Sequence, residues 1–304
     1  MFSSSTQKNR WTFESVQTLN ELREKANRKF KSKYEAILTD EWRSQLLSWS
    51  EEQHLCQLVM ETAIRFTETF QPQMPQSLIW TAFSYFKRFY LNHSALEYSA
   101  KNVMMTCLYE ACKVDEFYVT IDQFVANLKS GTPESNGENI LSLEPIILAK
   151  LDYHLIVHCP FRPLEGHLID MKTRLPDWGD FEKLRPAAAT FLRQALLSDV
   201  ALLYPPAQIS LAALHYSAQS LDKSLTPYLE AICQTGQAAQ LRARLEEIVA
   251  AVWAVKTLSQ EKSKLLQGRM KLSVQALATL DDKQRKRLPQ AAGVDSMDQD
   301  EDDQ

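Results

Sequence analysis

The longest nearly apolar part of the chain is Tyr85–Phe117, YFKRFYLNHSALEYSAKNVMMTCLYEACKVDEF. It predicts two helices that are apolar on nearly every side and joined by a short polar turn. A helix of this kind is buried, either in a large bundle or in a membrane. Lys87, Arg88, Lys101 and Lys113 interrupt the run, and no uninterrupted apolar stretch reaches the roughly 18 residues of a membrane span. We therefore expect a central helix pair in a soluble bundle, with no membrane partner.

Composition favours an all-α protein. The chain has 304 residues, enough for one large domain or two ordinary ones. Only 7 residues are glycine, whereas most nucleotide-binding α/β enzymes need glycine-rich loops to hold phosphate groups. The net charge is −4, and the C-terminus concentrates acidic residues at Asp295, Asp298, Asp300, Glu301, Asp302 and Asp303. The rest of the chain is nearly neutral, so direct nucleic-acid binding is not expected.

Cysteine usage indicates reduced thiols in a nuclear or cytosolic protein. The cysteines form an odd set, and most lie in apolar helical runs: Cys56, Cys107, Cys112, Cys159 and Cys233. The first ten residues are polar and lack the apolar region of a signal peptide. His154, His158 and Cys159 have a spacing that suits a metal, but no second ligand cluster accompanies them. We expect neither a metal site nor a cofactor.

The first 49 residues predict an N-terminal segment with one amphipathic helix. Residues 1–9 are rich in serine and polar residues, and we expect them to be mobile. Thr12 is predicted to cap a helix whose apolar residues recur every three or four positions, at Val16, Leu19, Leu22, Ala26 and Phe30. Eight basic residues against three acidic ones between Lys8 and Lys33 indicate a solvated face or, alternatively, a partner-facing helix. Residues 34–49 are expected to be a connector.

Residues 50–157 predict a five-helix bundle. Ser50 and Gln53 form a capping box for its first helix, Pro75 suits the first turn of the second, and Ser99 caps the third. A short helix at 121–128 and a loop at 130–137 follow. Pro145 leaves two alternatives for the fifth helix. Either Ser142 caps a short helix with Pro145 in its first turn, or a longer helix bends at Pro145.

Residues 158–257 repeat this pattern. Helices are predicted near 161–175, 180–200, 206–220, 226–233 and 238–257, which suggests a tandem repeat of one bundle. Residues 258–288 predict a long amphipathic helix, and residues 289–304 a disordered acidic tail. Residues 283–289 resemble a nuclear-import patch, although a charged helix end fits them equally well.

The chain resembles the cyclin H family in three places. YFKRFYL (residues 85–91) and CKVDEF (residues 112–117) are similar to the first cyclin box, although YFKRFY also occurs in cyclin C. HCPFRPLEG (residues 158–166), LID (168–170) and KTR (172–174) resemble the start of the second box in this family. WTF (residues 11–13), LR (22–23) and ANRKF (26–30) resemble the family's N-terminal helix. The resemblance covers residues 7–260 and implies two tandem five-helix cyclin boxes flanked by N-terminal and C-terminal helices.

This resemblance implies a regulatory subunit without catalytic residues of its own. Cyclins of the family activate the catalytic subunit of the cyclin-dependent-kinase-activating kinase, usually together with a RING-finger assembly factor. The trimer phosphorylates the activation loops of kinases. Within TFIIH it also phosphorylates the C-terminal domain of RNA polymerase II, which implies a nuclear location.

The resemblance also implies a kinase interface. In cyclins, a lysine at the end of the third box helix and a glutamate in the fifth make polar contacts with the kinase, and these roles carry over to Lys113 and Glu144. Val114 and Phe117 would supply apolar contact beside them. Each charged residue has a simpler alternative, because Lys113 near a helix C-terminus and Glu144 in a first turn are both favoured by the helix dipole. The first box helix, HLCQLVMETAIRF (residues 54–66), lacks the MRAIL-like substrate-docking sequence of mitotic cyclins.

Other function classes are less well supported. A cyclin-fold transcription scaffold that binds DNA or transcription factors would need a basic face across both boxes, and the chain is nearly neutral. A cyclin C-like subunit of the Mediator kinase module is disfavoured by the sequence of residues 158–174. An enzyme would need a nucleophile with its base, a glycine-rich loop or a metal site, and the sequence indicates none.

Overall fold

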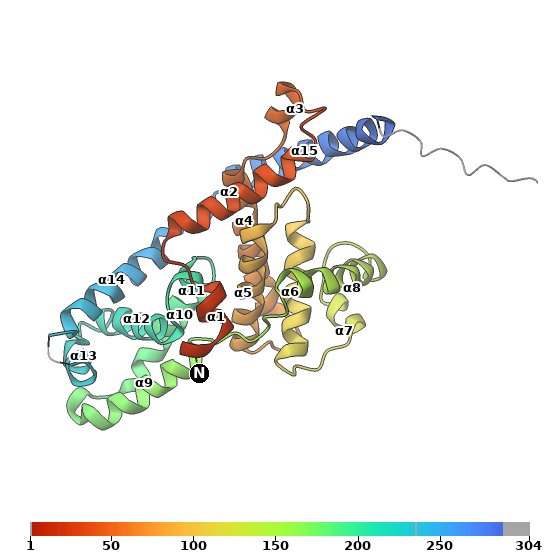
Figure 1. Ribbon diagram of the computed structural model, residues 1–304. Coiled ribbons are helices and arrows are strands. Elements are labelled where there is room, and N and C mark those ends of the chain that lie inside the picture. Colours follow the sequence, from red (N-terminus) through yellow and green to blue (C-terminus); the bar gives the residue numbers. More distant parts are fainter. Residues whose placement is uncertain (1, 235, 288–304) are drawn as a thin grey trace, which may run out of the picture.

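Every regular element of the described chain is a helix (Figure 1). The computed structural model describes residues 2–234 and 236–287, and the predicted all-α fold is confirmed. Within these residues no helix is both long enough and apolar enough to cross a membrane. The predicted acidic tail at 289–304 lies outside the described residues.

The first bundle contains the central helix pair that the sequence predicts. Every residue from Leu78 to Leu91 in the second helix of the bundle is buried, as is every residue from Val103 to Cys112 in the third. These two helices pack against each other, and the third also packs against the fifth. The five helices are α4 (Trp49–Thr69), α5 (Gln76–Asn92), α6 (Ala100–Val114), α7 (Ile121–Ala126) and α8 (Pro133–Lys150).

The capping box of α4 lies two residues earlier than predicted. The Ser48 hydroxyl accepts the Glu51 N–H at 3.2 Å, and the Glu51 carboxylate accepts the Ser48 N–H at 2.8 Å. Both this pair and Ser50–Gln53 fit the sequence pattern of a capping box. The earlier pair is used because Leu47, which is fully buried, is held by a hydrogen bond from its N–H to the Ser273 hydroxyl. The chain therefore enters the helix directly after this anchor.

Helix α8 is longer than predicted. The Thr132 hydroxyl accepts the Ser135 N–H at 3.2 Å, so the helix begins within the expected loop 130–137, with Pro133 in its first turn. It then continues through Pro145, and the alternative of a short helix capped by Ser142 is wrong. Proline removes one helix hydrogen bond, but the buried residues Ile140 and Ile147 on either side of Pro145 keep the helix on the core.

The second bundle follows the predicted pattern, with one difference. The expected helix at 180–200 is divided into η3 (Phe181–Leu184), α10 (Arg185–Ala195) and α11 (Val200–Leu203). Pro186 lies in the first turn of α10 and separates it from η3, and residues 196–199 form a turn before α11. The central helix is α12, which packs against α9, α10 and α14. The remaining elements are α9 (Phe161–Arg174), η2 (Pro176–Trp178), α12 (Pro206–Gln219), α13 (Thr226–Ile232) and α14 (Ala238–Ala254).

Residues 2–9 are ordered, although residues 1–9 were predicted to be mobile. They form η1 (Phe2–Ser4) and α1 (Thr6–Trp11), and Trp11 is buried. The amphipathic helix follows as α2 (Val16–Ser32). Ser15, not Thr12, caps α2, because the Thr12 hydroxyl donates back to the Gln7 carbonyl at 3.0 Å and thereby closes α1.

Two more helices complete the flanks. The expected connector at 34–49 contains α3 (Asp40–Gln45), and α15 (Gln260–Arg287) packs against α3 and α4. Helix α15 buries Leu266, Leu277 and Leu280 on one side. The Tyr34 hydroxyl, just after α2, donates to Asp281 of α15 at 2.7 Å. The C-terminal helix is therefore part of the folded body and extends past α2 in Figure 1.

Candidate functional site

The C-terminal end of α6 is held by a Schellman motif. The Phe117 N–H donates to the Cys112 carbonyl at 2.8 Å, and the Glu116 N–H donates to the Lys113 carbonyl at 3.3 Å. Glu116 occupies the left-handed position of the motif, with φ 55°, where glycine is the usual residue. The last turn of α6, and the direction in which the Lys113 side chain leaves it, are therefore fixed by backbone hydrogen bonds.

The structure brings Lys113 and Glu144 together. The Lys113 Nζ lies 2.5 Å from Oε1 of Glu144 on α8, and 2.9 Å from Oε1 of Glu110 one turn earlier on α6. The same ammonium lies over the Tyr109 ring, 4.6 Å from its centre, close enough for a cation–π contact. Glu144 lies in the interior of α8, not in its first turn. This position excludes the alternative that Glu144 only interacts favourably with the dipole at a helix N-terminus.

Both pKa shifts at this site follow from its geometry. Partial burial alone would lower the pKa of Lys113, but hydrogen bonds to Glu144 and Glu110 outweigh burial and raise it. The ammonium is therefore charged at neutral pH. Burial raises the pKa of Glu110, the nearby Glu144 carboxylate raises it further, and Lys113 opposes the shift.

This charged group lies at the edge of an apolar surface. On α8, Leu141, Glu144, Pro145 and Leu148 share one face by helical spacing, and Leu141 is 48% exposed. On the α6 side, Val114 is half-buried, as is Phe117, which also packs against the core. The four residues predicted as an interface thus lie at the end of α6 and on α8, where Figure 1 shows the two helices side by side.

Comparison with known proteins identifies the family. The model of the cyclin N-terminal domain matches residues 14–156, and that of the cyclin C-terminal domain matches residues 159–260. Cyclin-H of Xenopus laevis is 40% identical over 234 residues, which cover 75% of this chain and 72% of the relative. The chain belongs to the cyclin H family. It is therefore a regulatory cyclin subunit that activates a cyclin-dependent kinase, and it is not itself the kinase.

Two solved structures share the fold of this cyclin. The structure of the CAK complex of Chaetomium thermophilum bound to ATP-gamma-S contains a chain that matches with a TM-score of 0.77 and 22% identity, over 98% of each chain. The yeast TFIIK (Kin28/Ccl1/Tfb3) complex contains a chain that matches with a TM-score of 0.67 and 24% identity, over 82% of this chain and 99% of the other. At these identities the likeness shows the fold alone.

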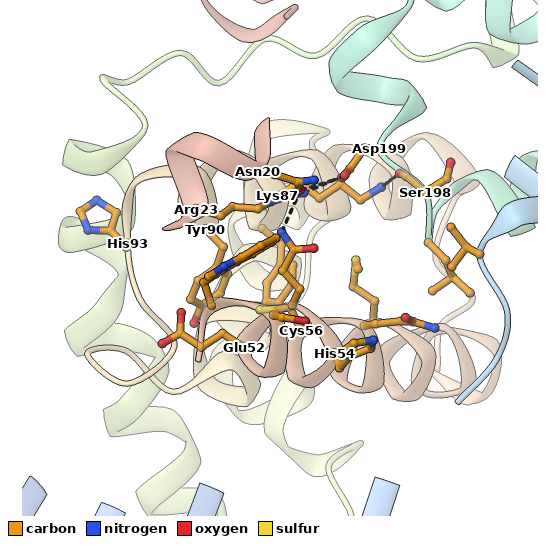
Figure 2. Close-up of a pocket in the computed structure, with 18 residues that line it drawn as sticks. Asn20, Arg23, Glu52, His54, Cys56, Lys87, Tyr90, His93, Ser198 and Asp199 are labelled. Carbon is orange, nitrogen blue, oxygen red and sulfur yellow. Dashed lines mark hydrogen bonds and ion pairs between the residues drawn. The ribbon is translucent and has the colours of Figure 1, made fainter. Parts of the chain in front are cut away.

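Sequence reasoning missed a charged cluster where the N-terminal helix, the first box and the second box meet. Lys87 is buried in it, and Arg23 and Asp199 are half-buried. Figure 2 shows Arg23 of α2 and Lys87 of α5 directed toward Asp199 and Ser198 of the second box. Arg23 makes two hydrogen bonds to the Asp199 carboxylate, at 2.7 and 2.8 Å. Lys87 donates to the Ser198 carbonyl. A cavity of about 260 Å³ adjoins them and is lined from all three parts. This cluster fixes how the two boxes sit against each other.

The charges of this cluster affect one another's pKa values. Burial would raise the pKa of Asp199, but Arg23 and Lys87 lower it below its usual range. Burial lowers the pKa of Lys87 to about 8, and Asp199 only partly opposes that shift. Lys87 and Arg88 were interpreted from the sequence as charges that interrupt an apolar helix, yet their side chains are only 5% and 2% exposed.

Arg88 belongs to a second contact, between α1 and the connection of the two boxes. Its Nη1 donates to the His154 carbonyl at 3.0 Å, and its guanidinium lies over the Trp11 ring at 5.3 Å. The indole N–H of Trp11 donates to Nδ1 of the same His154 at 3.2 Å. The Gln7 side chain pairs with both backbone groups of His158. His154 and His158 therefore hold α1 in place. In the part of the chain that the structure describes, no group of three or more His, Cys, Asp or Glu residues could hold a metal ion.

Proposed function

We propose that the surface formed by Lys113, Val114, Phe117 and Glu144 binds the kinase subunit and favours its active conformation. An active protein kinase requires an ion pair between the lysine of its third strand and the glutamate of its C-helix. A rigid bundle pressed against that helix shifts the kinase toward the active state only by binding that state more tightly. Helices α6 and α8 offer such a rigid surface, because the Schellman motif fixes one and the bundle core fixes the other.

The observation that carries this proposal is the 2.5 Å contact between Lys113 and Glu144. Their side chains are 40% and 24% exposed, so both groups are accessible to a partner while each holds the other in position. Leu141 and Val114 add apolar area around them. Charged groups in such a surface orient the partner, and the apolar contact supplies most of the affinity.

We further propose the assembly in which this cyclin acts. The yeast complex of similar fold contains Kin28, Ccl1 and Tfb3, and the complex from Chaetomium thermophilum is a CAK complex. These comparisons support a cyclin-dependent kinase as the catalytic partner, with a RING-finger assembly factor as the third subunit. By extension, the complex belongs to TFIIH in the nucleus and phosphorylates kinase activation loops and the C-terminal domain of RNA polymerase II.

The test is to reconstitute the kinase with wild-type cyclin, Lys113→Ala, Glu144→Ala and the matched control Lys101→Ala. Lys101 is an exposed lysine in the first turn of the same helix and binds the Ser130 hydroxyl at 2.9 Å. At a rise of about 1.5 Å per residue, it lies roughly 18 Å from Lys113 along α6. The measurement is phosphorylation of a kinase activation-loop peptide at saturating ATP.

We expect Lys113→Ala and Glu144→Ala to lower stimulation by about tenfold at subsaturating cyclin, as for the loss of a hydrogen-bonded charge in an interface. Lys101→Ala should behave as wild type. Equal stimulation by all four proteins would remove Lys113 and Glu144 from the kinase interface. The cyclin alone should show no phosphate transfer with any of these substitutions.

A further inference from the structure

Glu110 is a buried carboxylate with a specific partner. It lies on α6 one turn before Lys113, its side chain is 4% exposed, and its Oε1 lies 2.9 Å from the Lys113 Nζ. Placing a carboxylate in an otherwise apolar helix is unfavourable unless a charged partner compensates for the lost water. The residues around it on α6, from Val103 to Cys112, are all buried. Its exposure is too low for contact with another protein, so its effect on a partner acts through Lys113.

The numbers of hydrogen-bond donors and acceptors on Lys113, Glu110 and Glu144 indicate what each residue contributes. An ammonium has three N–H donors and no acceptor, and each carboxylate has two acceptor oxygens. Lys113 uses one donor on Glu110 and one on Glu144, which leaves a third for a partner. Glu144 uses Oε1 on Lys113, and its carboxyl group also interacts with the Glu110 side chain. The buried Glu110 and the half-buried Glu144 therefore hold Lys113 from two sides.

We propose that Glu110 is a positioning residue of the kinase-binding surface, one that keeps the Lys113 ammonium paired from within α6 while Glu144 turns toward the kinase. The inference rests on the proposed function of Lys113 and Glu144. Without Glu110, a kinase group that draws Glu144 away leaves the ammonium with only the Tyr109 ring, 4.6 Å away. With Glu110 present, Lys113 keeps a charge-assisted hydrogen bond throughout binding. Glu110 thus lowers the cost of opening the Lys113–Glu144 pair.

The experiment is a double-mutant cycle on kinase binding. The affinity of the purified kinase subunit is measured by calorimetry for wild-type cyclin, Glu110→Leu, Lys113→Met and the double variant. Glu110→Gln serves as the conservative variant, because its amide oxygen still accepts a hydrogen bond from Lys113. The control Glu61→Leu removes a carboxylate of similar burial on α4, where Glu61 accepts from Gln57 and from the Leu258 N–H. Thermal unfolding of each variant is recorded alongside.

We expect Glu110→Leu to weaken kinase binding by about tenfold, in keeping with the loss of one hydrogen bond to a charged group. Glu110→Gln should restore most of that loss. In the Lys113→Met background, Glu110→Leu should change the affinity by less than about twofold, because residues in one network are coupled. Glu110→Leu should not lower the melting temperature, since it replaces a buried charge with an apolar side chain.

Two results would overturn the inference. The first is that Glu110→Leu lowers the kinase affinity equally in the wild-type and Lys113→Met backgrounds, because a purely structural role of Glu110 does not depend on Lys113. The second is weaker binding by Lys113→Met together with unchanged binding by Glu110→Leu, which would reject Glu110 and leave the interface intact. Wild-type affinity of Lys113→Met would instead reject the proposed function, and the role of Glu110 with it.

Discussion

Replacing Lys87 with methionine should stabilise this cyclin at pH 7 and destabilise it above pH 10. Lys87 is the buried member of the charged cluster between the boxes. It is 5% exposed, and its charged neighbours are Arg23 and Asp199. Burial lowers its pKa to about 8 from the usual 10.5. The folded state therefore holds the Lys87 proton less tightly than the unfolded chain does. Methionine has a similar shape and carries no charge to desolvate.

The expected magnitude follows from linkage. Between pH 8 and pH 10.5 the unfolded chain binds the extra proton, so the stability of the wild type rises with pH across that range. The full rise is on the order of 3 kcal/mol for a pKa lowered from 10.5 to about 8. Methionine also leaves the Ser198 carbonyl without its donor, which costs about 1–2 kcal/mol. Lys87→Met should thus be about 1–2 kcal/mol more stable at pH 7 and less stable by a similar amount above pH 10.

Urea unfolding of both proteins at pH 7, 8, 9 and 10 measures this difference. Tyrosines and cysteines also titrate in the range, and subtracting the two proteins cancels their contributions. The difference in unfolding free energy should decrease steadily with pH and change sign near pH 9. A difference that stays constant from pH 7 to pH 10 would contradict this prediction, because Lys87 would then have the same pKa in the folded and unfolded states.

Three further substitutions test other parts of the fold. Asp199→Asn should lower the free energy of unfolding at pH 7 by roughly 2–4 kcal/mol, because it leaves Arg23 without its carboxylate. A decrease of less than about 0.5 kcal/mol would mean that the pair contributes no more than an exposed surface salt bridge. Trp11→Ala should lower the free energy of unfolding by about 3–5 kcal/mol and make α1 sensitive to trypsin. If the variant resisted trypsin as well as the wild type does, the packing of α1 on His154 would be contradicted. Glu116→Gly should stabilise the protein by about 1 kcal/mol, since φ is 55° there. Chemical denaturation measures this gain, and a loss would argue against the left-handed turn.

The central helix pair and most box helices were predictable because their apolar residues are local in sequence. The uninterrupted apolar run of α5 and α6 is visible without knowing its partners, and it corresponds to the buried stretches from Leu78 to Leu91 and from Val103 to Cys112. Lys113 was placed at the end of α6 by the same local pattern. The family resemblance named Lys113 and Glu144 as residues that contact the kinase, and the structure adds that the two side chains lie against each other.

The features that sequence reasoning missed depend on distant contacts. Helix α1 has six residues, which is too short to be stable alone, and it forms because Trp11 packs near Arg88 and His154. The partners of Lys87 lie more than 100 residues away, in the second box, so nothing near Lys87 in the sequence indicates which group its ammonium binds. The role of Glu110 was not predicted, because the sequence shows only a single carboxylate within an apolar run. Its partners become evident only when the structure places Lys113 and Glu144 beside it.

The most direct test of the account is the affinity of the purified kinase subunit for the wild-type cyclin and for the double variant Lys113→Ala/Glu144→Ala. Removing both charges also leaves the buried Glu110 without its ammonium partner. Thermal unfolding of both proteins is therefore recorded, so that a loss of stability is distinguished from a loss of kinase contact. At a temperature where both proteins are folded, calorimetry should show binding to the double variant weakened by at least about tenfold. Equal affinities for the two proteins would contradict the claim that this surface of α6 and α8 binds the kinase.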